Sequence, residues 1–134
     1  MGELKYSRQR EAILEALILR HDHPTADTLY RALREDLPHI SLGTVYRNLN
    51  LLSELGKIRK IRSDSGIEHY DAETHEHYHL VCRSCGRVLD LPMEAIRDLD
   101  RLAEQGGVGT VEGHALVFYG CCAECLDSTQ DTLA

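Results

Sequence analysis

Apolar residues recur every three or four positions in three early segments of the chain, which predicts three amphipathic helices. The first is expected to run from Ser7, as N-cap, to about Arg20. The second is expected to begin at Thr25. The third should run from Ser41 to Gly56, because glycine readily supplies a left-handed C-cap. The expected inward-facing residues are Ile13, Leu14, Leu17 and Ile18, then Ala26, Leu29, Tyr30 and Leu33, then Val45, Leu49 and Leu52.

A short basic hairpin is predicted after the third helix. Residues 57–62, KIRKIR, alternate isoleucine with basic side chains, and the turn SDSG leads into IEHYDA at 67–72. Three helices followed by such a hairpin are typical of a winged helix, in which the third helix enters the major groove and the wing contacts phosphate. The candidate DNA contacts are Thr44, Tyr46, Arg47 and Asn48 on the helix, with Lys57, Arg59, Lys60 and Arg62 on the wing. An ordinary helical subdomain with a solvated basic edge is the alternative.

The second half of the chain predicts a small α/β unit. A strand is expected over 74–82, a helix over 91–105 and one or two strands over 110–120, after the flexible GGVG. A unit this thin is expected to associate through a sheet edge, giving a homodimer. The predicted fold class is α+β, with a winged-helix domain over 1–72, a hinge near 70–76 and a dimerisation domain over 73–134.

Charge separates the same two halves. The whole chain has a net charge of −7, but residues 1–63 carry 11 Lys/Arg against 8 Asp/Glu, whereas residues 64–134 carry 4 against 14. A basic half suits phosphate and an acidic half suits cations. With no apolar run long enough to span a bilayer and no signal-like N-terminus, we expect a cytoplasmic protein that does not act at a membrane.

Four of the five cysteines form two C-x-x-C knuckles, at 82–85 and 122–125. Thiols stay reduced in the cytoplasm, and two such knuckles can place four thiolates tetrahedrally around Zn²⁺. A thioredoxin-like redox pair would need only one knuckle. The pattern therefore predicts a structural zinc on Cys82, Cys85, Cys122 and Cys125. Cys121 is given no role.

Histidines cluster just before the first knuckle. His75, His77 and His79 alternate along THEHYHLVC and would share one face of a strand, with carboxylates nearby. Neutral imidazole suits first-row divalent metals. This pattern favours a second metal site over structural histidines.

Five blocks of the sequence, in order, resemble the ferric-uptake-regulator superfamily: HPTADTLYRAL, ISLGTVYRNLNLLSELG, HYD, HYHLVCRSCG and FYGCCAEC. The resemblance covers residues 7–125. It implies a dimeric repressor of double-stranded operator DNA, with no organic small-molecule substrate and no enzymatic activity. It also implies a regulatory Fe²⁺ or Mn²⁺ held by His23, Asp71, His77, His79 and Asp90.

Within the superfamily the aspartates at 71 and 90 resemble the peroxide-responsive branch, in which peroxide oxidises a metal-bound histidine, here His23 or His77. Arg47 instead resembles iron-uptake regulators, so an iron sensor and a zinc-uptake regulator stay open as alternatives. A further metal site of many relatives is degraded, with only His114 retained. From other classes, a metallohydrolase lacks a separate general base, and a zinc-ribbon interaction module would leave His23 and Asp71 without a task.

Overall fold

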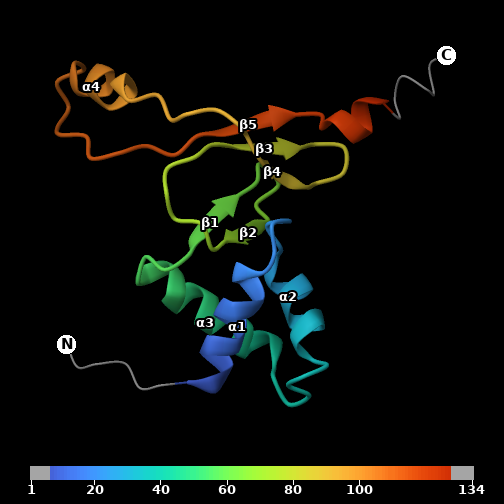
Figure 1. The fold of residues 1–134 in the computed structure, drawn as a ribbon. Coiled ribbons are helices and arrows are strands. Elements are labelled where there is room, and N and C mark those ends of the chain that lie inside the picture. Colours follow the sequence, from blue (N-terminus) through green and yellow to red (C-terminus); the bar gives the residue numbers. More distant parts are fainter. Residues whose placement is uncertain (1–6, 128–134) are drawn as a thin grey trace. The chain divides into compact units, whose positions relative to one another are not determined.

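The computed structural model describes residues 7–127 and forms two compact units, the first ending at Thr74 and the second beginning at His75 (Figure 1). The first unit contains α1 (Arg8–Ile18), α2 (Ala26–Leu33), α3 (Leu42–Glu54), β1 (Arg59–Arg62) and β2 (Glu68–Asp71). The second contains β3 (His79–Cys82), β4 (Val88–Asp90), α4 (Asp98–Glu104) and β5 (Val117–Gly120). Within residues 7–127 no helix is long and apolar enough to cross a membrane.

Hydroxyl side chains start all three helices of the first unit, as the sequence predicts. Ser7 accepts a hydrogen bond from the backbone N–H of the third following residue, and Thr25 and Ser41 do the same, at 3.1–3.2 Å. Each cap accepts a hydrogen bond from a backbone N–H group of the first turn, which has no acceptor within the helix. Gly56, with φ of 74°, ends α3 in the left-handed conformation that glycine tolerates.

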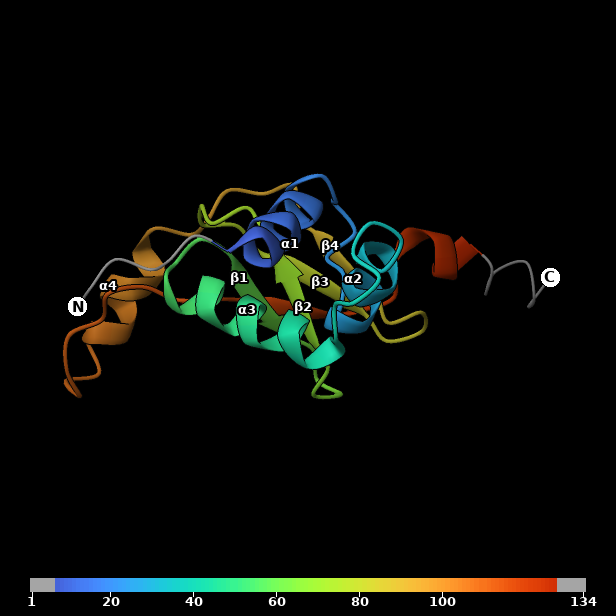
Figure 2. The ribbon, with the colours of Figure 1, turned by 90° about the horizontal axis from the view of Figure 1, so that it is seen from below.

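The core of the first unit joins all three helices to the hairpin. Most of the predicted inward-facing residues are buried, and Ile58 and Tyr70 extend the same cluster. Leu14 and Tyr30 are only partly buried, and Ile18, at the last position of α1, is 54% exposed. β1 and β2 pair antiparallel with Arg59 opposite Asp71. The basic strand β1 therefore lies beside β2, which carries Asp71. Figure 2 shows α1, α2, α3 and this hairpin from below.

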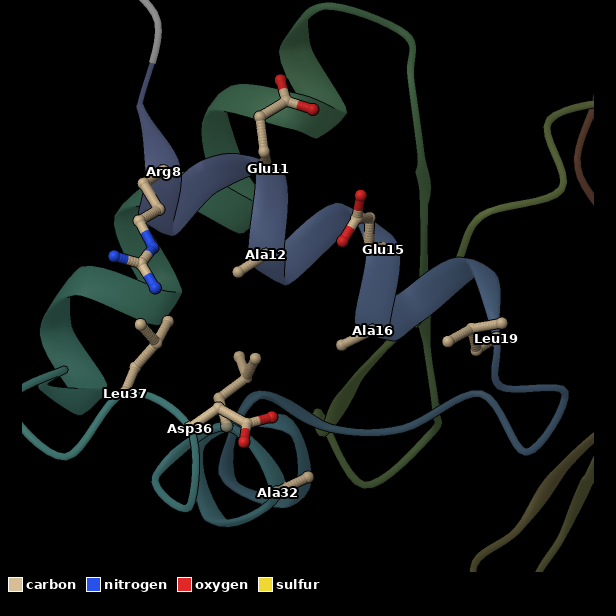
Figure 3. Close-up of a pocket in the computed structure, with 10 residues that line it drawn as sticks. Arg8, Glu11, Ala12, Glu15, Ala16, Leu19, Ala32, Asp36 and Leu37 are labelled. Atoms are coloured by element: carbon tan, nitrogen blue, oxygen red, sulfur yellow. The ribbon is translucent and has the colours of Figure 1, made fainter.

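A shallow groove of about 510 Å³ lies between α1 and α2. Figure 3 shows alanines 12, 16 and 32 along it, with Glu11, Glu15 and Asp36 on its rim and only Arg8 as a basic residue. Carboxylates would repel phosphate, so this side of the unit is unsuited to nucleic acid.

A three-stranded mixed sheet forms the second unit, in the order β4-β3-β5. β3 is central; it pairs antiparallel with β4 and parallel with β5. Parallel neighbours end at the same edge, so the segments that follow β3 and β5 begin side by side, with Cys82 opposite Gly120. This connection needs the long crossover of residues 91–116 that contains α4.

Two predicted elements are shorter than their apolar patterns indicate. The helix expected over 91–105 covers only Asp98–Glu104, since the Ile96 backbone N–H donates to the Tyr78 hydroxyl at 2.7 Å. The strand expected over 110–120 covers only Val117–Gly120, and the Val111 N–H donates to a Glu104 carboxylate at 2.9 Å. In both places a side chain takes a backbone donor that a regular element would have used.

Candidate metal centres

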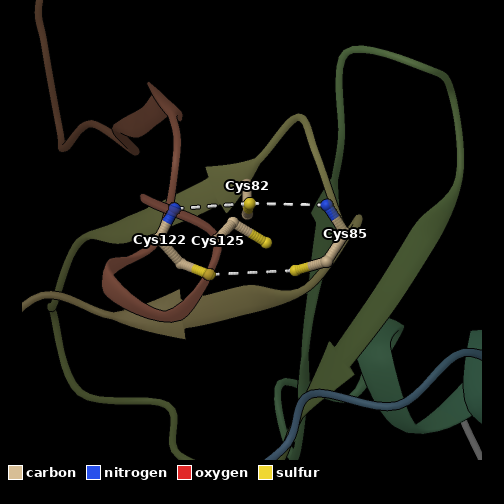
Figure 4. A group of neighbouring side chains, drawn as sticks. All are labelled: Cys82, Cys85, Cys122 and Cys125. Carbon is tan, nitrogen blue, oxygen red and sulfur yellow. Dashed lines mark hydrogen bonds between the residues drawn. The ribbon is translucent and has the colours of Figure 1, made fainter. Parts of the chain in front are cut away.

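The four knuckle cysteines meet because each knuckle begins at the end of a strand in the parallel pair. The Arg83 N–H donates to the Gly120 carbonyl at 2.8 Å and holds the two segments together just beyond the paired strands. The four Sγ atoms all lie within 4.8 Å of one another, and those of Cys85 and Cys122 are 3.9 Å apart (Figure 4). A tetrahedral zinc with Zn–S bonds of about 2.3 Å requires sulfurs roughly 3.8 Å apart, so this donor set fits the ion.

Backbone amides already stabilise the thiolate form at this cluster. Cys82 Sγ accepts N–H groups from Cys122 at 3.3 Å and from Cys85 at 3.4 Å, drawn as dashed lines in Figure 4. These bonds lower the pKa of Cys82 to about 5. The backbone N–H of Cys125, followed by the Arg87 guanidinium, lowers the pKa of Cys122. The pKa of Cys125 is raised, chiefly by its contact with Cys122. Thiolates already favoured in this way are suited to bind a cation.

A histidine and a carboxylate lie together in the first unit. His23 Nε2 lies 3.1 Å from an Asp71 carboxylate oxygen, and both side chains are more than nine-tenths buried. The loop that carries His23 is fixed to β2, because the Tyr70 N–H donates to the Pro24 carbonyl and the His69 ring donates to the His23 carbonyl. This role of His69 has no local pattern in the sequence, because the two residues are 46 positions apart.

His23 has φ of 51°, and no other non-glycine among residues 7–127 has positive φ. The left-handed conformation costs an L-residue about 1–2 kcal/mol. Such strain persists where surrounding contacts over-determine a residue, and it gathers at functional sites.

Two histidines and one carboxylate lie together in the second unit. His77 Nε2 lies 3.1 Å and His79 Nε2 lies 3.3 Å from the same Asp90 oxygen, and their rings are 4.4 Å apart. The antiparallel register places His79 opposite Asp90, which explains the contact between these two side chains. The His77 Nδ1–H donates to the His75 carbonyl at 2.7 Å, which orients the ring so that Nε2 faces Asp90. His75 itself is exposed.

The candidate DNA contacts on α3 are accessible and partly preordered. Tyr46 and Arg47 are exposed, and the Arg47 guanidinium donates to the Thr44 hydroxyl at 3.1 Å. Asn48 donates to the Thr44 carbonyl at 2.9 Å. On the hairpin, Lys57 and Lys60 are exposed and Arg59 is partly buried, while Arg62 is held by Glu68 at 3.0 Å.

Two further features follow from tertiary contacts that the sequence analysis did not anticipate. Arg87 donates to Cys122 Sγ at 3.3 Å and to Glu124 at 3.1 Å, which places a positive charge beside the thiolates. Tyr78, His114 and Asp100 form a hydrogen-bonded chain. Cys121 is exposed, with its sulfur 3.8 Å from the Ser84 hydroxyl.

Comparison with known proteins agrees with these features. The model of the ferric uptake regulator family matches residues 2–119. The peroxide-responsive repressor PerR of Staphylococcus aureus (strain Mu50) is 37% identical over 124 residues, which is 92% of this chain and 84% of that protein.

Solved structures of similar proteins include the Campylobacter jejuni peroxide stress regulator, with TM-score 0.74, 34% identity and coverage of 87% and 88% of the two chains. The Vibrio cholerae ferric uptake regulator has TM-score 0.72, 30% identity and coverage of 89% and 92%. The mixed α and β fold, the four-cysteine cluster and these likenesses lead to one conclusion: the chain belongs to the ferric uptake regulator family.

Proposed function

We propose that this protein is a metal-responsive repressor that binds operator DNA and releases it after peroxide oxidises a metal-bound histidine. The observation that carries the proposal is the likeness to peroxide-responsive repressors, at 37% identity over 92% of the chain. The donor set supports it: His23 with Asp71 in one unit, and His77 and His79 with Asp90 in the other. Three imidazoles and two carboxylates suit Fe²⁺ or Mn²⁺.

A single ion shared by both sets would hold the two units at a fixed angle. The first unit would then act as a winged-helix domain, with Tyr46 and Arg47 reading base edges and Lys57 and Lys60 meeting phosphate. Because two such domains must match two half-sites, an ion that fixes the angle changes the affinity for DNA. The first domain is expected to cover about 1–72 and the second 73–134.

A homodimer is expected from the apolar surface of the second unit. None of the side chains in α4 is buried, and β5 lies at the edge of the sheet with Phe118 and Tyr119 each 43% exposed. An unpaired strand edge beside exposed aromatic residues favours association with a second copy. The zinc on the four cysteines would fix the ends of β3 and β5, and so the shape of that edge.

Peroxide sensing requires an oxidisable ring at the shared ion. Fe²⁺, when bound, supplies the one-electron chemistry that activates peroxide. The His23 or His77 ring would take one oxygen atom on a carbon, and peroxide would leave as water. An oxidised ring is a poorer ligand, so the contact between the units would be lost and DNA would be released. Both rings are buried, which would confine the reaction to oxidant generated at the site.

The decisive experiment uses the full-length zinc-loaded protein and a duplex that its Mn²⁺-loaded form selects from a random pool. Fe²⁺-loaded and Mn²⁺-loaded samples are treated with peroxide, and DNA retention is measured beside the mass of each histidine peptide. We expect Fe²⁺-loaded protein alone to release DNA and to gain one oxygen on the His23 or His77 peptide. The exposed His39 serves as the internal control and should stay unmodified.

Release of DNA only when iron is withdrawn, with intact histidines, would instead identify an iron-responsive regulator. Arg47 on the recognition helix and the likeness to the Vibrio cholerae regulator favour this second candidate. DNA binding that depends on Zn²⁺ alone would identify a zinc-uptake regulator.

A further inference from the structure

A buried tyrosine lies between the two histidines of the second unit's donor set. The side chains of His77 and His79 both point to Asp90, whereas the Tyr78 ring contacts His114, Phe118 and the amide of Ile96. Tyr78 directly precedes β3, and the Leu91 N–H bond to its carbonyl extends the β3–β4 pairing to it. Side chains alternate along such a segment, so Tyr78 faces away from the donors. Its side chain is 2% exposed.

A chain of three consecutive hydrogen bonds passes through the hydroxyl group of this tyrosine, each donated toward the next group. The Ile96 N–H donates to the Tyr78 oxygen at 2.7 Å. The Tyr78 hydroxyl then donates to His114 Nε2 at 2.6 Å, and the His114 Nδ1–H donates to an Asp100 carboxylate at 2.8 Å. In this arrangement Tyr78 and His114 each donate one hydrogen bond and accept one, and the Asp100 carboxylate accepts the last. We call Tyr78, His114 and Asp100 the relay.

The relay connects three separate parts of the second unit. Tyr78 adjoins β3, Asp100 belongs to α4, and His114 precedes β5. Backbone bonds fix the same place, because the Leu91 N–H donates to the Tyr78 carbonyl at 3.0 Å. Tyr78 therefore has both its backbone and its hydroxyl held, and the flanking His77 and His79 cannot turn about the strand axis without breaking the relay.

We propose that the relay of Tyr78, His114 and Asp100 positions His77 and His79 for the regulatory metal, as positioning residues that do not touch the ion. The inference rests on the proposed function. Metal sites depend on groups that orient their ligands, and losing an outer partner typically weakens metal binding by 10–100-fold. Since the relay acts through the backbone of Tyr78, we expect a loss near the lower end, roughly 10-fold.

The test measures Mn²⁺ binding to zinc-loaded full-length protein by the loss of the free-ion electron paramagnetic resonance signal. Tyr78→Phe removes the central hydroxyl and should weaken Mn²⁺ binding roughly 10-fold while zinc content stays at the wild-type level. Tyr119→Phe is the matched control, because it deletes the same atom from an exposed tyrosine on the same sheet and should bind Mn²⁺ as wild type does.

A second pair of variants tests orientation rather than folding. Asp100→Asn keeps an acceptor for the His114 Nδ1–H, whereas Asp100→Ala removes it, and Asp100 is on a surface helix where both variants should fold. We expect Asp100→Asn to bind Mn²⁺ with wild-type affinity and Asp100→Ala to bind it roughly 10-fold more weakly. The visible spectrum of Co²⁺ at the site should change in Tyr78→Phe and Asp100→Ala only.

Two negative results have different meanings. A wild-type protein that takes up no second metal beside zinc refutes the proposed function and this inference with it. A wild type that binds Mn²⁺, with Tyr78→Phe and Asp100→Ala binding it equally well and with unchanged Co²⁺ spectra, refutes the positioning role alone. If Tyr78→Phe does not fold, the Asp100 pair decides.

Discussion

Replacing His23 separates two roles, since the residue is strained in its backbone and its ring faces Asp71 at 3.1 Å. We consider His23→Ala, His23→Asn and His23→Gly. All three delete the ring and leave the buried Asp71 carboxylate with fewer partners, although it still accepts the Glu73 N–H at 2.9 Å. That loss costs about 1–3 kcal/mol of unfolding free energy and is shared by the series.

Differences within the series report on the backbone alone. At φ of 51° alanine bears the left-handed cost of about 1–2 kcal/mol, which glycine avoids. Glycine instead loses about 0.5–1 kcal/mol through the greater freedom of the unfolded chain. Metal-free His23→Gly should therefore be more stable than His23→Ala by about 0.5–1 kcal/mol, with Asn between them because it tolerates this conformation.

The stability gained on binding Mn²⁺ tests whether the His23 imidazole is a metal ligand. Wild-type protein at a Mn²⁺ concentration of about 100 times its dissociation constant should gain about 2.7 kcal/mol, whereas all three variants should gain far less at that concentration. Urea unfolding with and without Mn²⁺, on samples with zinc content verified, measures both quantities. A variant that keeps the full Mn²⁺-dependent gain would show that His23 is not a ligand. A His23→Ala variant that is more stable than His23→Gly by about 0.5–1 kcal/mol, as at an unstrained position, would show that the backbone strain is absent.

Three other predictions concern separate parts of the chain. Arg87→Gln removes a guanidinium donor to Cys122 and should speed zinc loss to a chelator roughly 10-fold, whereas Arg83→Gln inside the first knuckle should not. Arg47→Ala should cost about 1–3 kcal/mol of operator binding and relax sequence preference, whereas Lys60→Ala should reduce the salt slope by about 1 without changing preference. Burial raises the pKa of Tyr70, so its neutral form is favoured in the folded chain; stability should fall as pH rises past about 10, and Tyr70→Phe should lessen that fall.

Local chemistry explains which features the sequence could predict. The helix starts at Ser7, Thr25 and Ser41 depend on a hydroxyl side chain and an amide three residues later, and all three starts are confirmed. The cysteine cluster was predictable because the C-x-x-C spacing by itself indicates a tetrahedral zinc site. In the structure the four sulfur atoms do lie close together.

The shortened elements depend on distant partners. The apolar pattern from Leu91 to Gln105 is helical, but Ile96 gives its amide to a tyrosine 18 positions away. Hydrogen bonds to residues at least 14 positions away likewise define the roles of His69, Arg87 and Asp100. Single residues of this kind have no periodicity, so only the folded chain reveals them.

The division of the donor set has a consequence for sensitivity. One imidazole and one carboxylate belong to the first unit, two imidazoles and one carboxylate to the second. If the two sets share one ion, as proposed, neither set alone would complete the coordination that Fe²⁺ or Mn²⁺ prefers, so tight binding would require both units in one arrangement. Binding free energies are reciprocal: if the metal favours the arrangement that grips DNA, operator DNA must tighten metal binding by the same factor. A Mn²⁺ affinity that operator DNA leaves unchanged would therefore be incompatible with a shared ion, whatever the relatives do.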